Sequence, residues 1–77
     1  MQNGLSDPVR LVSPNETRLM CGGLSTSTLR RLIAANAFPR PVILARDRHN
    51  KPVRIAFVYA ELTAWCRDRV EAERGAA

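Results

Sequence analysis

The stretch that decides the fold is GLSTSTLRRLI, which occupies residues 23–33. Ser25 is the predicted N-cap of a helix, because its hydroxyl can accept a hydrogen bond from an unpaired N–H of the first turn. Leu24 and Leu29 hold the N′ and N4 positions of a hydrophobic staple, which directs the chain into the helix. One face then repeats apolar residues at helical spacing, namely Leu29, Leu32 and Ile33. We therefore expect an amphipathic helix over residues 26–36.

The outward face of this helix carries hydroxyl and guanidinium groups, from Thr26, Ser27, Arg30 and Arg31. Such a face suits a major groove, whose floor consists of base edges and whose walls are phosphates. We expect the hydroxyls of Ser25, Thr26 and Ser27 to lie near base edges or phosphate oxygens. Arg31 is the candidate for bidentate recognition of guanine, and Arg30 for a base or a phosphate. In the alternative interpretation, the hydroxyls only start the helix and the arginines are solvated.

A second helix start precedes this one. Ser13 is placed as N-cap, Pro14 stands at N1, where its missing N–H costs nothing, and Glu16 at N3 completes a capping box. We expect this first helix to run to about Cys21 and to bury Leu19 and Met20. It should end at residues 22–23, because a Gly-Gly pair can adopt the left-handed conformation of a tight helix exit. Two helices joined by a tight turn form a helix-turn-helix.

Strands are expected after the helix-turn-helix. Prolines 39 and 41 forbid further helix. Residues 42–45 and 53–57 are predicted strands, the second with Val53, Ile55 and Phe57 on one face and Arg54 on the other. The polar segment between them, residues 46–52, favours a turn, so the pair describes a wing. Residues 9–12 are expected to be a short strand or an extended lead-in.

The last predicted element is a helix from about Tyr59 to Arg69 or beyond. Its buried stripe consists of Val58, Leu62, Trp65 and Cys66. Trp65 is expected in the core rather than as a stacking platform for bases. Residues 1–8 are predicted to be a flexible arm and residues 71–77 a frayed tail, on either side of one domain at 9–70. The predicted fold class is α+β, a small winged helix-turn-helix with about three helices and a two-stranded wing hairpin.

Positive charge is concentrated in the middle of the chain. The net charge is +5, but residues 25–54 hold seven cations against one acid, which makes this segment +6. A concentrated basic surface is typical of nucleic-acid binders. In the wing, we expect four cations to contact the DNA backbone or the minor groove: Arg46, Arg48, Lys51 and Arg54. His49 and Asn50 are expected to form the tip of the wing. In the alternative interpretation, the positive charge is only a generic basic surface, and His49 is a solvated turn residue.

Several classes of function are disfavoured. One histidine and two cysteines are too few for a zinc site, so no metal or cofactor is expected, and Cys21 and Cys66 are predicted to be reduced core residues. We see no set of groups to which enzyme chemistry could be assigned. No apolar run approaches the roughly 20 residues that span a bilayer. Because the first residues lack the features of a signal peptide, a cytoplasmic location without membrane contact is expected.

The order of these motifs resembles the AlpA-type prophage regulators, small winged-helix proteins related to phage excisionases and, more distantly, to MerR DNA-binding domains. The segments that carry the resemblance are RLVSPNE, GLSTSTLRRLIAANAFPRPVIL, RIAF and AELTAWC, within residues 9–67. The resemblance implies sequence-specific binding of double-stranded DNA. Members regulate transcription of mobile-element genes or act as architectural directionality factors beside an integrase.

The chain departs from that pattern in four places. Arg30 stands where the family often has Tyr, and Ala60 stands where it usually has a helix-capping Ser or Asp. The glycine pair adds one residue to the turn, and the wing is longer and more basic. The first two departures bear on base preference and on where the last helix starts.

Two functions of different classes are compatible with these features. The first is a DNA-binding regulator or excisionase, monomeric when free and assembling cooperatively on DNA, since no apolar seam is left on the last helix. The alternative is a protein-interaction module, such as an anti-repressor or integrase partner, that applies its basic face to an acidic protein. An RNA binder is disfavoured, because the chain has no aromatic platform or glycine-rich clamp.

Overall fold

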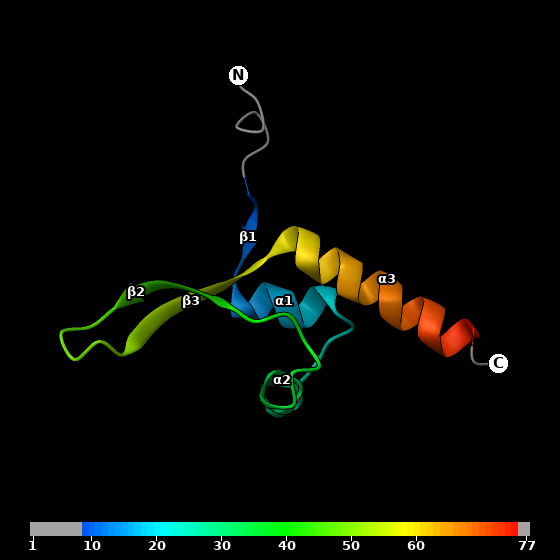
Figure 1. Ribbon diagram of the computed structural model, residues 1–77, viewed down its shortest axis with the longest axis horizontal. Helices are drawn as coiled ribbons and strands as arrows, with labels where there is room; N and C mark the ends of the chain where they lie inside the picture. Colours follow the sequence, from blue (N-terminus) through cyan, green and yellow to red (C-terminus); the bar gives the residue numbers. More distant parts are fainter. Residues whose placement is uncertain (1–8, 76–77) are drawn as a thin grey trace, which may run out of the picture.

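The computed structural model describes residues 9–75, which form a flat α+β domain of 49 × 39 × 19 Å (Figure 1). Its elements, in chain order, are β1 (Leu11–Val12), α1 (Pro14–Met20), α2 (Thr26–Ala34), β2 (Val42–Arg46), β3 (Pro52–Val58) and α3 (Tyr59–Gly75). Three helices and a three-stranded antiparallel sheet in this order make a small winged-helix-like fold, as predicted. The expected flexible arm, residues 1–8, lies outside the described residues.

The sheet has the strand order β1-β3-β2, so β3 is its central strand. β1 pairs with the end of β3 through Leu11↔Val58 and Val12↔Phe57, which confirms a strand in the lead-in. β2 pairs with the rest of β3, and its register shifts on both sides of Ala45. Figure 1 shows the β2–β3 hairpin extending to one side, away from the helices. Only the base of the hairpin therefore touches the body of the protein.

The core lies where this base meets the three helices. Its buried members are Val12, Cys21, Leu29, Phe38, Phe57 and Leu62, and half-buried side chains pack around them: Leu24, Leu32, Ile33, Tyr59, Trp65 and Cys66. The predicted apolar face of α2 is therefore confirmed. That of α3 is confirmed for Leu62, Trp65 and Cys66, whereas Val58 is the last residue of β3 and lies outside this cluster. On β3, exposure falls from 59% at Val53 to 0% at Phe57, because Val53 lies toward the outer end of the hairpin.

Trp65 and Phe38 fix the exit from α2. The indole Nε1 of Trp65 donates to the carbonyl of Ala37 at 2.8 Å. The ring of Phe38 meets Trp65 edge-on, with centroids 4.7 Å apart, and Phe57 likewise at 5.7 Å. Edge-to-face pairs of this kind add to the stabilisation from burial. Trp65 is thus part of the packing around the core, as expected, and it holds the segment that follows α2.

The prediction that α1 buries Leu19 and Met20 is wrong. Leu19 is 72% exposed and Met20 36% exposed, whereas Thr17 is completely buried. The inward face of α1 is set by Thr17 and Cys21, one turn apart, so residues two and three positions after Thr17 turn away from it. The Thr17 hydroxyl has no hydrogen-bond partner among the described residues, which typically costs about 1–3 kcal/mol. The N-cap was predicted correctly, since Ser13 Oγ accepts from the Glu16 N–H at 3.1 Å.

The ends of α2 and α3 also differ from expectation. α2 stops at Ala34, two residues early, because Asn36 adopts a left-handed backbone with φ 58°. The N–H of Ala37 then donates to the carbonyl of Leu32 at 2.8 Å, as in a Schellman motif. α3 follows β3 directly and continues to Gly75, through most of the predicted frayed tail, with residues 76–77 outside the described part.

Candidate nucleic-acid interface

The N-terminal end of α2 is organised by a short chain of hydroxyls. Ser25 Oγ accepts from the N–H of Thr28 at 3.1 Å, which confirms it as the N-cap, and donates to Thr28 Oγ1 at 2.9 Å. Arg31 Nη2 donates to the same Thr28 oxygen at 3.3 Å. Thr28 therefore links the helix cap to the arginine expected to reach a base. Thr28 was not among the interface residues predicted from the sequence, although its place one turn before Arg31 was a usable signal.

All of the α2 residues predicted to contact DNA are exposed: Ser25, Thr26, Ser27, Arg30 and Arg31. Leu29, on the opposite side, is 6% exposed and anchors the helix to the core. The hydroxyl proton and one lone pair of Ser25 are used in the cap, so it offers less to a ligand than Thr26 and Ser27. The outward face of α2 thus presents two hydroxyls and, one turn later, two guanidiniums.

The turn that leads into α2 is held by backbone conformation and by an arginine. Gly22 and Gly23 have φ values of 95° and 76°, as the Gly-Gly pair predicted. Arg18 Nη1 donates to the carbonyl of Leu24 at 3.2 Å, and its Nη2 bonds Asn15 Oδ1. Sequence reasoning missed this role of Arg18. Its position in the last turn of α1, close to the glycine pair, was the available signal.

The tip of the hairpin is built around Asp47, the acid of the basic segment. Its Oδ1 accepts from the N–H groups of His49 at 2.8 Å and Lys51 at 2.9 Å. The N–H of Asn50 donates to the carbonyl of Asp47 at 2.9 Å, and Asn50 itself has φ 65°. These bonds describe a tight hairpin turn with a left-handed residue, a conformation that Asn tolerates well. A turn at residues 46–52 was predicted from the sequence, but Asp47 was not identified as the residue that organises it.

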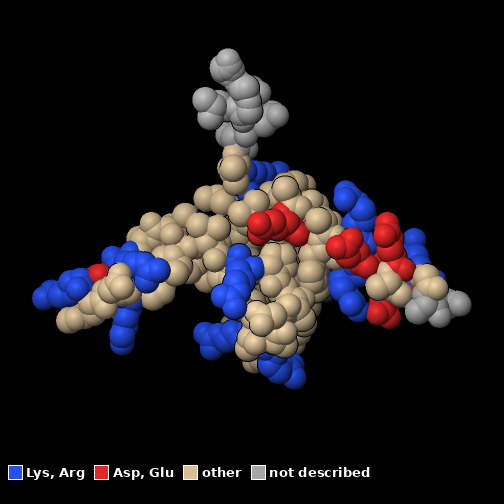
Figure 2. All heavy atoms as spheres, in the orientation of Figure 1, with Lys and Arg blue, Asp and Glu red and all other residues tan. Residues whose placement is uncertain are grey.

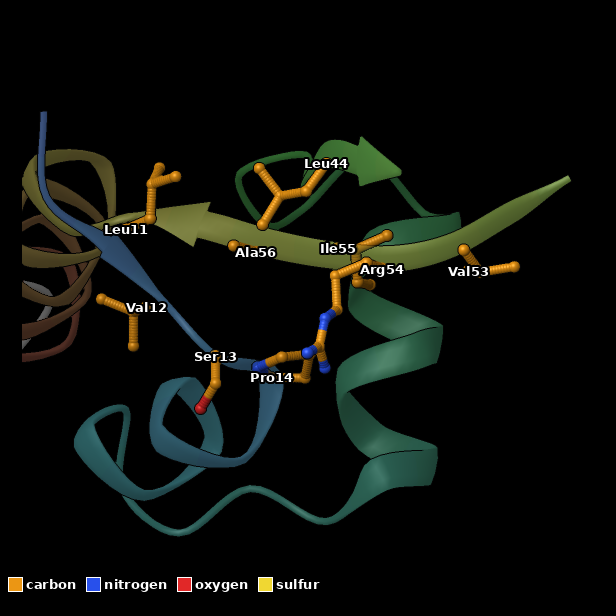
Figure 3. A pocket seen from close by; sticks show the side chains of 9 residues that line it. All are labelled: Leu11, Val12, Ser13, Pro14, Leu44, Val53, Arg54, Ile55 and Ala56. Carbon is orange, nitrogen blue, oxygen red and sulfur yellow. The ribbon is translucent and has the colours of Figure 1, made fainter. Parts of the chain in front are cut away.

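The predicted wing residues are all exposed: Arg46, Arg48, His49, Asn50, Lys51 and Arg54. They do not point in one direction. Arg46 Nη1 folds back to the carbonyl of Asn50 at 3.0 Å. Arg54 lies further down β3, and Figure 3 shows its guanidinium directed toward Pro14 at the start of α1. The structure therefore places Arg54 near the helices and separates it from the tip.

Cations dominate the hairpin and the surroundings of α2. Figure 2 shows blue side chains on both, whereas α3 carries both signs. Within residues 9–75, the ion pair that forms is Arg69–Glu73, at 2.7 Å in α3. The cations of residues 25–54 thus have no carboxylate partner in the described part of the chain, and Arg40 bonds the amide oxygen of Asn36 instead, at 3.1 Å. Uncompensated charges of one sign produce a positive potential that attracts polyanions.

No family model matches this chain, and neither does any curated protein or any solved structure. The resemblance to AlpA-type regulators therefore stays a prediction. None of the helices described between residues 9 and 75 is long and apolar enough to cross a membrane. In the same residues, no group of three or more His, Cys, Asp or Glu side chains is arranged to hold a metal ion.

Proposed function

We propose that the protein binds double-stranded DNA, with α2 in the major groove and the hairpin against the adjacent backbone or minor groove. The observation that carries this proposal is the unpaired positive charge of α2 and the hairpin beside a helix whose outward face is polar and whose inward face is fixed in the core. An exposed helix held in this way can enter a groove without losing its packing.

The α2 side chains divide by the contacts they suit. Thr26 and Ser27 lie at the helix N-terminus, where the free N–H groups and the helix dipole attract phosphate. Arg31 is partly oriented by Thr28, which lowers the conformational entropy that a bidentate contact to guanine costs. Arg30 is free to reach a base or a phosphate.

The hairpin suits contacts that do not depend on sequence. Arg48 and Lys51 extend from the tip region, where the backbone is ordered by Asp47. Arg54 faces the body of the protein and suits the backbone of the groove entered by α2. Such phosphate contacts raise the affinity for every sequence alike.

Within DNA binding, the motif order favours a regulator of mobile-element genes or an excisionase that assists an integrase. These two roles share the same interface. They differ in their effect on the bound DNA, because an excisionase must bend DNA over neighbouring sites, whereas a regulator can act from one operator. A circular-permutation bending assay on bound DNA separates them.

The deciding experiment is a salt titration of DNA binding. If about five phosphates are contacted, log affinity falls with log salt at a slope of roughly −4 to −5. Fluorescence anisotropy with a labelled duplex measures this slope, and a single strand of the same sequence is the control. Absence of duplex binding at low salt, together with capture by an acidic protein surface, would favour the protein-interaction alternative.

A further inference from the structure

Two cysteines far apart in the sequence meet at the edge of the core. Cys21 is the C-cap of α1, immediately before the turn into α2, and Cys66 lies in α3. They are 45 positions apart, yet their Sγ atoms are 3.7 Å from each other. Both are free thiols, Cys21 at 9% exposure and Cys66 half-buried. Nothing in the DNA interface uses either of them.

We propose that Cys21 and Cys66 are a modification site, at which a small-molecule disulfide converts the two thiols into an intramolecular disulfide. A disulfide has an S–S length of about 2.05 Å, so the sulfurs must approach each other by roughly 1.7 Å. A small side-chain rotation together with a slight shift of α3 against α1 supplies such a movement. The fold has already brought the two groups together, which is the main entropic obstacle to closing a long loop.

The two thiols are not equivalent in reactivity. Burial raises the pKa of Cys21 to about 11, and the adjacent Cys66 sulfur adds to that shift. A thiol with so high a pKa is a poor nucleophile at neutral pH, because the thiolate is the reactive form. Cys66 is more accessible to solvent and is therefore the group that meets the oxidant.

The intramolecular disulfide forms by two successive thiol–disulfide exchanges. The Cys66 thiolate attacks one sulfur of the small disulfide, forms a mixed disulfide and releases one thiolate. Cys21 then loses its proton to solvent and attacks the Cys66 sulfur, which expels the second small thiolate. The protein loses two protons and two electrons, which is two hydrogen atoms in mass, and the small disulfide takes them up to become two thiols.

Closure ties Cys21, the C-cap of α1 immediately before the turn into α2, to α3. A cross-link over a loop of this length restricts mainly the unfolded chain, so the oxidised protein should unfold at a higher temperature. We expect a rise in Tm of about 10 °C or more for a domain of this size. The inference does not depend on what the protein binds.

The experiment incubates the folded, reduced full chain with mixtures of reduced and oxidised glutathione and follows it by intact mass under non-reducing conditions. We expect a monomer lighter by two hydrogens, with a peptide map that joins Cys21 to Cys66. Repeating the equilibrium in urea should lower the ring-closure constant by about 30-fold or more, because the folded state no longer holds the sulfurs together. The Tm of the oxidised chain is measured in parallel.

Cys66→Ser is the matched control, because it removes the accessible thiol at a half-buried site and should neither lose two hydrogens nor gain in Tm. The wild-type mass map decides the matter even if that variant folds poorly. Disulfide-linked dimers, a glutathione adduct that never closes, or a ring-closure constant equal in buffer and in urea would each overturn the proposal. An oxidised form with an unchanged or lower Tm would also overturn it.

Discussion

The helix α2 and the β2–β3 hairpin are both exposed and basic, but they are held in place by different means. α2 is buried along one face by Leu29, is capped by Ser25 and ends in the Schellman motif at Asn36. β2, in contrast, is exposed at all five of its residues. The position of the hairpin depends on its strand pairing and on the hydrogen bonds of Asp47 at the tip. One cationic surface is thus placed by the core and the other by local turn chemistry.

The difference bears on what each surface can recognise. A bidentate contact to a base edge needs a side chain positioned to a fraction of an ångström, and α2 has the packing to supply it. A hairpin with solvent on most sides adjusts easily, which suits contacts to phosphate. If the protein binds DNA as proposed, we expect sequence discrimination from α2 and general affinity from the hairpin, and paired substitutions test this division.

The largest expected effect is on stability. Leu29→Ala should destabilise the domain by about 2–5 kcal/mol, because it leaves a cavity beneath α2. Leu44→Ala, at a position on β2 that is 50% exposed, should change stability by no more than about 0.5 kcal/mol. Urea denaturation followed by circular dichroism measures both. If the two substitutions had similar costs, the hairpin would be part of the core and the contrast would fail.

A smaller effect is expected on specificity. Arg31→Ala should reduce discrimination between cognate and scrambled duplexes by about 1–3 kcal/mol, the value of a bidentate guanine contact. Arg48→Ala should weaken binding to both duplexes alike and make the salt slope shallower by about 1. Anisotropy titrations with the two duplexes measure the difference. An equal loss on both duplexes for Arg31→Ala would move that residue to a phosphate contact.

The smallest expected effect concerns neighbouring copies on DNA. The protein should sediment as a monomer and bind repeated sites cooperatively, with the hairpin of one copy near α1 of the next. Exposed apolar side chains are available on both surfaces: Leu19 at 72%, Leu44 at 50% and Val53 at 59%. Leu19→Ser should lower the cooperativity by a few-fold, roughly 1 kcal/mol, and leave binding to a single site unchanged.

Footprinting on a fragment with several repeats measures this cooperativity, and Val70→Ser, at an exposed position on α3, is the matched control. A stable dimer in solution with one palindromic footprint contradicts the prediction. It would show that the apolar residues of α1 or the hairpin form a closed interface rather than an open array.

The predictions from sequence were most accurate where a few neighbouring residues determine the structure. The caps at Ser13 and Ser25 and the left-handed glycines at 22 and 23 were placed correctly, because those hydrogen bonds and dihedral preferences span only a few residues. The apolar face of α2 was predicted correctly for the same reason. The cationic residues are exposed as expected, although their contact with DNA stays a prediction.

The errors arose where distant segments compete for the same space. The face of α1 that packs inward depends on its contacts with β3 and α3. As a result, Thr17 is fully buried and Leu19 is exposed, although leucine is usually the more buried residue type. α2 ended early because Asn36 accepted a left-handed conformation that lets Phe38 reach Trp65. No window of a few residues contains this information.

The sequence by itself determined the order of the elements, the capped starts of α1 and α2, the turn at the glycine pair and the location of the positive charge. Each of these depends on local hydrogen bonding, on backbone preferences or simply on composition. Only the tertiary structure decided that Thr28 orients Arg31, that Arg54 faces the body while Arg48 lies at the tip, and that Cys21 meets Cys66 across 45 positions. The physical reason is that side-chain direction and long-range proximity depend on how the helices pack on β3, and packing is a property of the whole chain.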